Sequence, residues 1–113
     1  MTPYCPEAGD IVWMSFEPHE GTEQAGHRPA LVLSPAVVNS RTGRCSACPI
    51  TGTVKPFPFV TVLPEGLEIG GAVLVDQLRG LDWKARRARF VCRAPDHTMR
   101  EVRAKLKALL GIE

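Results

Sequence analysis

The sequence predicts a mainly β fold, a small barrel or curled antiparallel sheet, followed by one C-terminal α-helix. Two observations carry this prediction. Short β-rich apolar runs separated by turn residues recur through the first 93 residues, and the segment after Pro95 instead carries apolar residues at helical spacing. A chain of 113 residues that is 44% hydrophobic is long enough for one core, so residues 1–113 are expected to form a single domain.

Six segments have the composition of strands. They are DIVWMSF (10–16), ALVLS (30–34), CSACPIT (45–51), FVTVL (59–63), AVLVDQL (72–78) and ARFVCR (88–93). Between them, NSRTGR (39–44) has the composition of a tight turn, and GTVKPFP (52–58) contains two prolines, which are poor members of a β-ladder. The connector before the second strand and the one at 52–58 are long for hairpins, and such loops are either disordered or functional.

The C-terminal segment is predicted to be a helix. Pro95 suits the first helical position, Asp96 suits the positive end of the helix dipole, and Gly111 suits the last turn. One apolar stripe is expected to pack on the sheet as core, namely Met99, Val102, Leu106, Leu109 and Leu110.

Composition excludes several classes of protein. No apolar run is long enough to span a bilayer, and the N-terminus lacks the features of a signal peptide, so a cytoplasmic location without membrane contact is expected. The four cysteines are then expected to be reduced thiols. Cys45 and Cys48 form a CxxC without a second pair, and residues three apart on a strand face opposite sides, so no metal or other cofactor is expected.

Positive charge gathers late in the sequence, although the net charge is only +2. The segment KARRAR (84–89) and the nearby Arg79 are the densest part of this region. Two interpretations remain open for them, a solvated strand surface or a contact with a polyanion.

Arg28 is the strongest candidate for chemistry. The following Pro29 biases Arg28 toward extended backbone, which places it at the start of the second strand. A guanidinium fixed in this way is a good fork for phosphate. The structural alternative is an exposed ion pair with Glu23, worth about 0 to 1 kcal/mol. Thr51 ends the third strand, where its hydroxyl could face the same opening as Arg28.

These residues carry a family resemblance. The span PEAGDIVWMSFEPHEGTEQAGHRPALVLSP (6–35) resembles the opening of the MazF/PemK (Kid) family of toxin endoribonucleases. The similarity continues through CPIT, PFPF and VDQLRGLDW to the ending V-x-x-K-L-x-x-L-L, and so covers nearly the whole chain.

The resemblance implies an SH3-like barrel of antiparallel strands that works as a homodimer. It implies metal-free cleavage of single-stranded RNA at a short motif, leaving a 2′,3′-cyclic phosphate and a 5′-hydroxyl. A MazE-like antitoxin is expected to lay a flexible tail across the RNA site. By residue match, Arg28 binds phosphate and donates a proton, Thr51 stabilises the transition state, and Glu23 either orients Arg28 or accepts the 2′-hydroxyl proton.

Further residues are expected to contact RNA bases or phosphates. They are Gln24, His27, Lys55, Asp76, Gln77 and Arg79. The chain departs from the Kid branch at two positions, because Thr22 replaces a histidine and Leu74 an arginine. A second threonine that often follows the P-x-T motif is replaced by Gly52. The His, Arg and Asp chemistry of that branch therefore does not transfer whole.

Two other functions share the predicted fold. CcdB-type toxins bind DNA gyrase without cleaving anything, and they have no need of the Glu23, Arg28 and Thr51 combination. A catalytically inactive barrel that only binds its antitoxin would lack one of those three residues, and all three are present.

Overall fold

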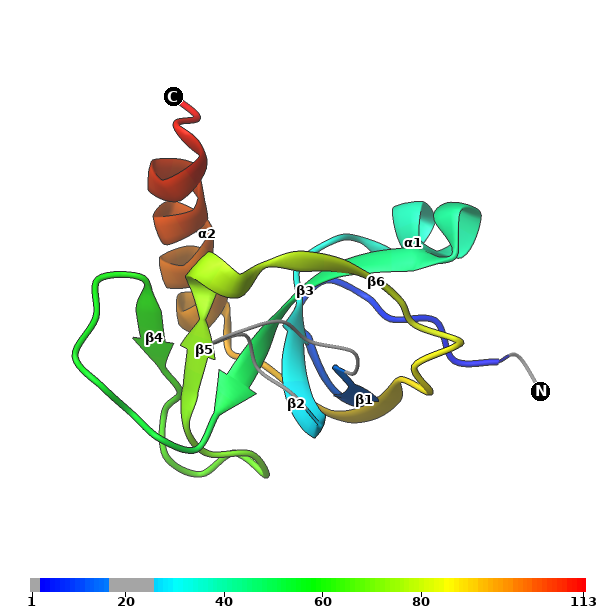
Figure 1. Ribbon diagram of the computed structural model, residues 1–113, viewed down its shortest axis with the longest axis horizontal. Coiled ribbons are helices and arrows are strands. Elements are labelled where there is room, and N and C mark those ends of the chain that lie inside the picture. The colour runs from blue at the N-terminus through cyan, green and yellow to red at the C-terminus, as the bar shows by residue number, and fades with distance from the viewer. Residues whose placement is uncertain (1–2, 17–25) are drawn as a thin grey trace.

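The computed structural model describes residues 3–16 and 26–113 (Figure 1). In chain order the elements are β1 (Asp10–Ser15), β2 (His27–Val32), α1 (Ala36–Thr42), β3 (Arg44–Thr51), β4 (Val60–Val62), β5 (Ala72–Leu74), the 3-10 helix η1 (Val75–Gln77), β6 (Arg79–Asp82), β7 (Arg89–Arg93) and α2 (Asp96–Leu110). In this part of the chain no helix is long and apolar enough to cross a membrane.

The strands form one curled antiparallel sheet in the order β4-β5-β3-β2-β1-β7, with β6 paired to β3. Strand β3 is the centre of this arrangement. Its first half pairs with β6, where Cys45 lies opposite Leu81, and its end pairs with β5, where Thr51 lies opposite Ala72. Its other edge pairs with β2. The predicted barrel-like sheet with a C-terminal helix is thereby confirmed.

Alternating side chains build a hydrophobic core on each face of the sheet. The core beneath α2 contains Ile11, Leu31, Cys48, Ile50, Val73, Val75, Met99 and Val102. The core inside the curl contains Val12, Met14, Phe16, Ala30, Val32, Cys45, Ala47, Leu81 and Trp83. Because successive residues of a strand face opposite sides, β1, β2 and β3 each contribute to both cores.

Cys45 and Cys48 lie in different cores, as the strand periodicity predicts. All four cysteines are free thiols. Burial raises the pKa of Cys45 to about 11 and that of Cys48 to about 12. Both thiols therefore stay protonated at neutral pH, which suits packing and not metal binding.

The turn predicted at 39–44 is wrong. Residues 39–42 belong to helix α1, which ends at Thr42. Gly43 caps the helix in a left-handed backbone conformation with φ of 73°. The predicted strand 72–78 is wrong in its second half, because β5 ends at Leu74 and the chain passes through η1 into β6. Because of this break, β5 pairs with the end of β3 and β6 pairs with its first half. This pairing joins distant parts of the chain, so local composition does not predict it.

Helix α2 follows its prediction except at both ends. Pro95 caps the helix from extended backbone, so the first helical residue is Asp96. Met99 and Val102 are buried, but Leu109 and Leu110 are 37% and 58% exposed, so the prediction that they are core is wrong. The reason is visible in Figure 1, where the last turns of α2 project beyond the edge of the sheet.

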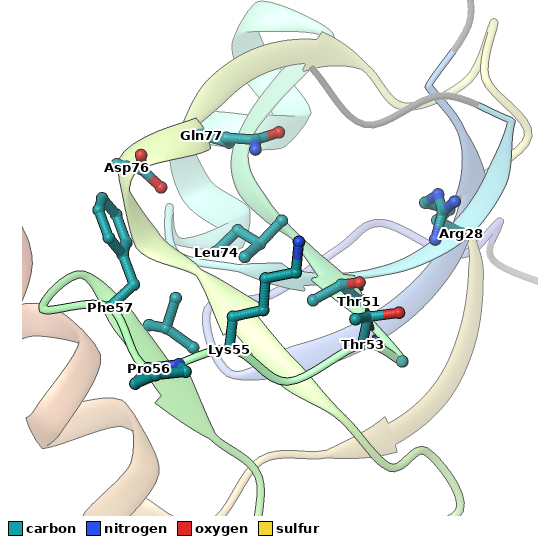
Figure 2. Close-up of a pocket in the computed structure, with 11 residues that line it drawn as sticks. Arg28, Thr51, Thr53, Lys55, Pro56, Phe57, Leu74, Asp76 and Gln77 are labelled. Carbon is teal, nitrogen blue, oxygen red and sulfur yellow. Dashed lines mark hydrogen bonds between the residues drawn. The ribbon is translucent and has the colours of Figure 1, made fainter. Parts of the chain in front are cut away.

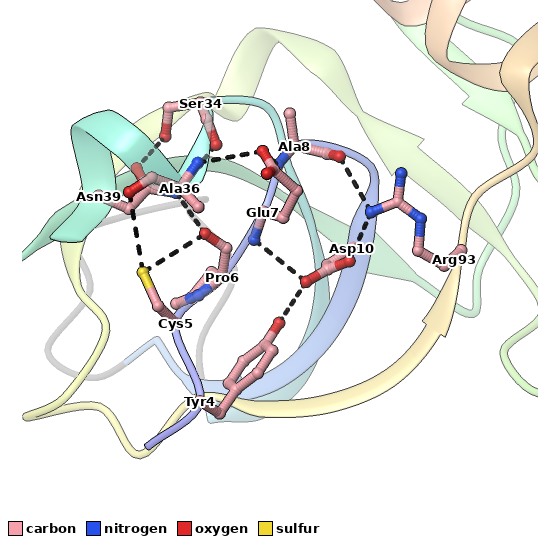
Figure 3. A network of polar contacts seen from close by, with 10 residues as sticks. All are labelled: Tyr4, Cys5, Pro6, Glu7, Ala8, Asp10, Ser34, Ala36, Asn39 and Arg93. Atoms are coloured by element: carbon pink, nitrogen blue, oxygen red, sulfur yellow. Dashed lines mark hydrogen bonds and ion pairs between the residues drawn. The ribbon is translucent and has the colours of Figure 1, made fainter. Parts of the chain in front are cut away.

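A buried carboxylate fixes the N-terminal segment against β1 and β7 (Figure 3). Asp10 is 4% exposed and accepts hydrogen bonds from the Tyr4 hydroxyl at 2.6 Å and from the Glu7 N–H at 3.1 Å. Arg93 of β7 donates to its other oxygen at 2.7 Å. Desolvation, followed by the hydrogen bond to Asp10, raises the pKa of Tyr4. The buried negative charge of Asp10 is therefore paired with the Arg93 guanidinium.

Asn39 joins helix α1 to the same segment (Figure 3). Its fully buried amide donates to the carbonyls of Pro6 at 2.8 Å and Ser34 at 2.9 Å, and its oxygen accepts from the Ser34 hydroxyl at 2.6 Å. Its backbone carbonyl accepts from the Trp83 indole at 3.1 Å. A seven-residue helix is unstable alone, so these contacts explain why it forms.

We expect Asn39→Leu to lower the free energy of unfolding by about 2 to 4 kcal/mol, because it strands two buried carbonyls and one hydroxyl. Urea denaturation would measure the change. Ser40→Ala is the matched control, since Ser40 is exposed on the same helix and should have almost no effect. Equal stabilities of the two variants would show that the Asn39 network does not hold α1 in place.

Candidate functional site

The ends of two strands bring Arg28 and Thr51 together. Arg28 is the second residue of β2, and Thr51 is the last residue of β3. Both side chains line one open pocket of about 700 Å³. The juxtaposition follows from the antiparallel pairing of β2 with β3, which places the start of one strand beside the end of the other.

The pocket combines donors with an apolar wall (Figure 2). Its lining residues are Arg28, Thr51, Gly52, Thr53, Lys55, Pro56, Phe57, Val60, Leu74, Asp76 and Gln77. Figure 2 shows Arg28 on one side, with the hydroxyls of Thr51 and Thr53 turned toward it. Phe57 and Asp76 lie on the opposite side, and Lys55 extends its ammonium group between the two sides.

Thr51 is held more firmly than a typical strand end. It is 8% exposed, and its hydroxyl oxygen accepts the N–H of Thr53 at 3.2 Å, which turns the chain into the 52–58 loop. Behind it, Gly71 adopts φ of 119°, and a Cβ added there would run into the Thr51 carbonyl oxygen. Gly71 also accepts the N–H of Leu63 at 2.9 Å. Close backbone approach therefore fixes the position of the Thr51 hydroxyl.

Gly71→Ala is expected to lower the free energy of unfolding by about 2 to 4 kcal/mol. The new methyl group would clash with the Thr51 carbonyl oxygen, and the φ angle is unfavourable for alanine. Thermal unfolding would measure this. The neighbouring Gly70 has no atom within 4 Å of an added Cβ, so Gly70→Ala is the matched control and should retain wild-type stability. A Gly71→Ala protein as stable as that control would mean that β5 can move away from Thr51.

The structure places the other sequence-predicted residues in different ways. Lys55, Asp76 and Gln77 line the pocket with Arg28 and Thr51. His27 precedes Arg28 on β2, so its side chain leaves the opposite face, where it stacks on Trp13. Arg79 lies outside the pocket lining, with its guanidinium 5.8 Å from the centre of the Phe16 ring. Glu23 and Gln24 lie outside the residues that the structure describes.

Sequence reasoning missed the apolar wall and one hydroxyl. Thr53, Pro56, Phe57 and Val60 all line the pocket, and so does Leu74, which the family resemblance marked only as a departure from the Kid branch. The length of the 52–58 connector indicated a loop that is either disordered or functional, but nothing in its composition showed which strand it would cover. Phe57 is 51% exposed and meets Phe59 edge-on at 6.4 Å between ring centres, so an aromatic face is open to a ligand.

Helix α2 holds the outer border of the pocket. The Lys105 ammonium donates to the Val60 carbonyl at 2.7 Å and to the Thr61 hydroxyl at 3.2 Å, and it pairs with Glu101 at 3.5 Å. These contacts fix β4, a strand of only three residues at the edge of the sheet. The helix thereby sets the place of Val60, although it contributes no residue to the lining.

The Arg28 side of the pocket is suited to an anion next to an apolar surface, and the opposite side carries the Asp76 carboxylate. Two cationic side chains and two hydroxyls supply donors, while Phe57, Val60 and Leu74 supply an apolar surface. No three His, Cys, Asp or Glu side chains within the described ranges gather into a group able to hold a metal ion. An RNA phosphate with an adjacent base matches these properties.

Comparisons with known proteins agree with this geometry. The family model described as PemK-like, MazF-like toxin of type II toxin-antitoxin system matches residues 7–110. The endoribonuclease toxin MazF of Escherichia coli K12 is 42% identical over 108 residues, which are 96% of each chain. The endoribonuclease toxin ChpB of the same organism is 38% identical over 110 residues, covering 92% of this chain and 93% of ChpB.

Solved structures show the same similarity. A crystal structure of MazF from Deinococcus radiodurans has a TM-score of 0.94 and 50% identity, covering 97% of this chain and all of that one. A MazE-MazF crystal structure from the same organism gives a TM-score of 0.88 and 46% identity, covering 98% of this chain and 100% of that one. The chain therefore belongs to the PemK/MazF family of toxins of type II toxin–antitoxin systems.

Proposed function

We propose that the protein is an endoribonuclease toxin that cleaves single-stranded RNA at a short motif without a metal ion. The observation that carries this is the Arg28 and Thr51 pair, which points donors into an open pocket beside an exposed aromatic ring. Two relatives support this proposal, since MazF and ChpB of Escherichia coli are both endoribonuclease toxins.

The reaction needs three things from the side chains. The 2′-hydroxyl of one nucleotide gives up its proton and attacks the adjacent phosphate, the phosphorane that forms carries added negative charge, and the bond between phosphorus and the 5′-oxygen breaks as that oxygen takes up a proton. Arg28 binds the phosphate oxygens through its planar fork and donates the proton, and the Thr51 hydroxyl stabilises the added charge. Lys55, which reaches between the two sides of the pocket, adds positive charge. The products are a 2′,3′-cyclic phosphate and a 5′-hydroxyl.

Glu23 completes the proposed catalytic group by residue match with the family, with two roles left open. A carboxylate there would orient Arg28 by a charge-assisted hydrogen bond, in which case the 2′-hydroxyl proton passes to water, or would itself accept the proton of the attacking 2′-hydroxyl. Two measurements distinguish these roles. If Glu23 is the general base, the cleavage rate rises with pH as its carboxylate ionises. If Glu23 orients Arg28, the variant Glu23→Gln retains part of the cleavage rate.

The far side of the pocket is proposed to bind a base. Phe57 and Leu74 supply apolar contacts, and Asp76 and Gln77 present a carboxylate and an amide that can recognise base edges. Leu74 stands where the Kid branch has arginine, so the wall is apolar at that point. Gln24, His27 and Arg79 are proposed to contact RNA outside this pocket.

Two partners are part of the proposal. The first is a MazE-like antitoxin whose tail covers the pocket, supported by the MazE-MazF crystal structures of Deinococcus radiodurans. The second is a second copy of the chain. Leu110 and Ile112 leave apolar surface exposed at the end of α2, and covering it would stabilise a dimer. Sedimentation velocity would measure the dimer directly.

Incubation of the purified protein with a long single-stranded RNA in EDTA tests the function, with ends mapped by primer extension. Discrete cuts at one recurring short motif are expected, each leaving a cyclic phosphate. Cuts abolished by EDTA would contradict metal independence. Folded protein that makes no cuts would favour a CcdB-type activity, which a gyrase supercoiling assay would then detect.

A further inference from the structure

The basic segment 84–89 contributes to a second pocket that the proposed reaction does not use. Arg87 and Arg89 line an open pocket of about 390 Å³ together with Trp13 and His27. This pocket, which we call the Trp13 pocket, shares no lining residue with the pocket of Arg28 and Thr51. Its volume lies within the range of about 300 to 1,000 Å³ that is typical of small-molecule sites.

Two of the side chains that line the Trp13 pocket are aromatic rings stacked on each other. Trp13 on β1 and His27 on β2 have ring centres 5.9 Å apart and planes within 28° of each other. Trp13 is half-buried, and His27 is exposed. Such a platform presents a flat face to solvent, and the bases of single-stranded RNA stack on flat aromatic faces.

Two arginines flank the platform. Arg89 lies opposite Trp13 in the pairing of β1 with β7. Arg87 has a left-handed backbone with φ of 56°, which is uncommon for a residue other than glycine, asparagine or aspartate. The turn that holds it is fixed to β1, because the Arg86 guanidinium donates to the Ser15 carbonyl at 3.0 Å and the Ser15 N–H donates to the Arg86 carbonyl at 3.3 Å. Both guanidinium groups thus start from fixed backbone.

We propose that the Trp13 pocket binds one nucleotide of the RNA substrate that flanks the cleaved phosphate. The base stacks on His27 and Trp13, and its phosphate is held by Arg87 and Arg89. This inference rests on the proposed function, because it assigns a second binding site for the same single-stranded RNA.

Strand β2 connects the two sites. His27 and Arg28 are neighbours, with Cα atoms about 3.8 Å apart, and their side chains leave opposite faces of the strand. The phosphate site at Arg28 and the stacking site at His27 therefore lie on opposite faces of β2 near its start. The cleaved phosphate and the stacked base then lie on two sides of one strand, which adds affinity without touching the reacting atoms.

The test uses a short single-stranded RNA that carries the cleavage motif and a 2′-deoxy nucleotide at the attacking position, so that it binds without being cut. Its affinity is measured for wild-type protein and for Arg87→Gln with Arg89→Gln. The double variant is expected to bind about tenfold more weakly. Its affinity should also depend less on salt, because each lost phosphate contact lowers the slope by about 0.7.

Arg100→Gln with Arg103→Gln is the matched control, since it removes the same charge from exposed positions of α2, away from both pockets. It should bind RNA nearly as wild type does. Equal losses in the two double variants would overturn the proposal, because they would show a general effect of charge.

Two further measurements locate the nucleotide. Bound RNA should quench the emission of Trp13, and this quenching should be absent in Trp13→Phe. Shortening the RNA one nucleotide at a time should reveal one flanking position whose removal weakens wild-type binding but not binding by the Arg87 and Arg89 variant. The proposal is overturned if every truncation affects both proteins equally.

The outcomes separate the inference from the function on which it rests. Cleavage by wild-type protein, with unchanged affinity in the Arg87 and Arg89 variant, would overturn the second site alone. Absence of cleavage by folded wild-type protein would overturn the proposed function and the second site together.

Discussion

Arg28→Ala is expected to lower the rate of RNA cleavage by about 10³-fold or more, while the protein remains folded. The size follows from the loss of a fixed cation beside a phosphate that gains charge in the transition state. Arg28 lies at the rim of the pocket near the start of β2 and is half-buried, and its side chain is not part of either hydrophobic core. Initial rates on a defined oligonucleotide, with circular dichroism of both proteins, measure the two effects.

Arg28→Lys is the control for charge. Lysine keeps the positive charge but cannot offer two parallel donors, so we expect activity between those of wild type and Arg28→Ala. If Arg28→Ala fails to fold, Arg28 stabilises the fold, and its position in the pocket is explained by that role and not by RNA cleavage. A folded Arg28→Ala protein that cuts RNA at the wild-type rate would remove Arg28 from the reaction.

Thr51→Val is expected to reduce kcat about 10²-fold with little change in KM. Valine has nearly the same shape as threonine, so the loss reports the Thr51 hydroxyl that lines the pocket. The Thr53 N–H loses its acceptor in this variant, but it lies in a solvent-exposed loop where water replaces the lost bond.

Thr51→Ser retains a hydroxyl and is expected to keep most of the activity, which makes it the matched control. Single-turnover rates at saturating RNA would separate the chemical step from binding. A fall in affinity with kcat unchanged would show that the Thr51 hydroxyl binds the ground state equally well and does not act in the transition state.

The pair of variants also distinguishes the two toxin activities that share the fold. An endoribonuclease depends on Arg28 and Thr51, whereas a toxin that binds gyrase has no use for a phosphate fork at this position. Loss of toxicity in both folded variants would therefore support RNA cleavage. Full toxicity in both would favour the gyrase-binding activity.

The places of Arg28 and Thr51 could be predicted because both residues stand near strand ends. Pro29 restricts Arg28 locally, and Thr51 ends an apolar run, so their places on the strands depended on near neighbours in the chain. Phe57 and Leu74 could not be identified in the same way. They reach the pocket because the 52–58 loop and strand β5 pass beside the end of β3, which is a contact between distant segments.

The sequence by itself determined the class of fold, the strand positions of Arg28 and Thr51, the separation of Cys45 from Cys48, and the C-terminal helix, because each depends on side-chain periodicity or on a neighbouring residue. Tertiary structure alone decided three other features. Asn39 stabilises α1 through buried hydrogen bonds, β3 shares its length between β5 and β6, and Trp13, His27, Arg87 and Arg89 meet at one pocket. These features depend on partners far along the chain, whose free energy of contact outweighs local preference.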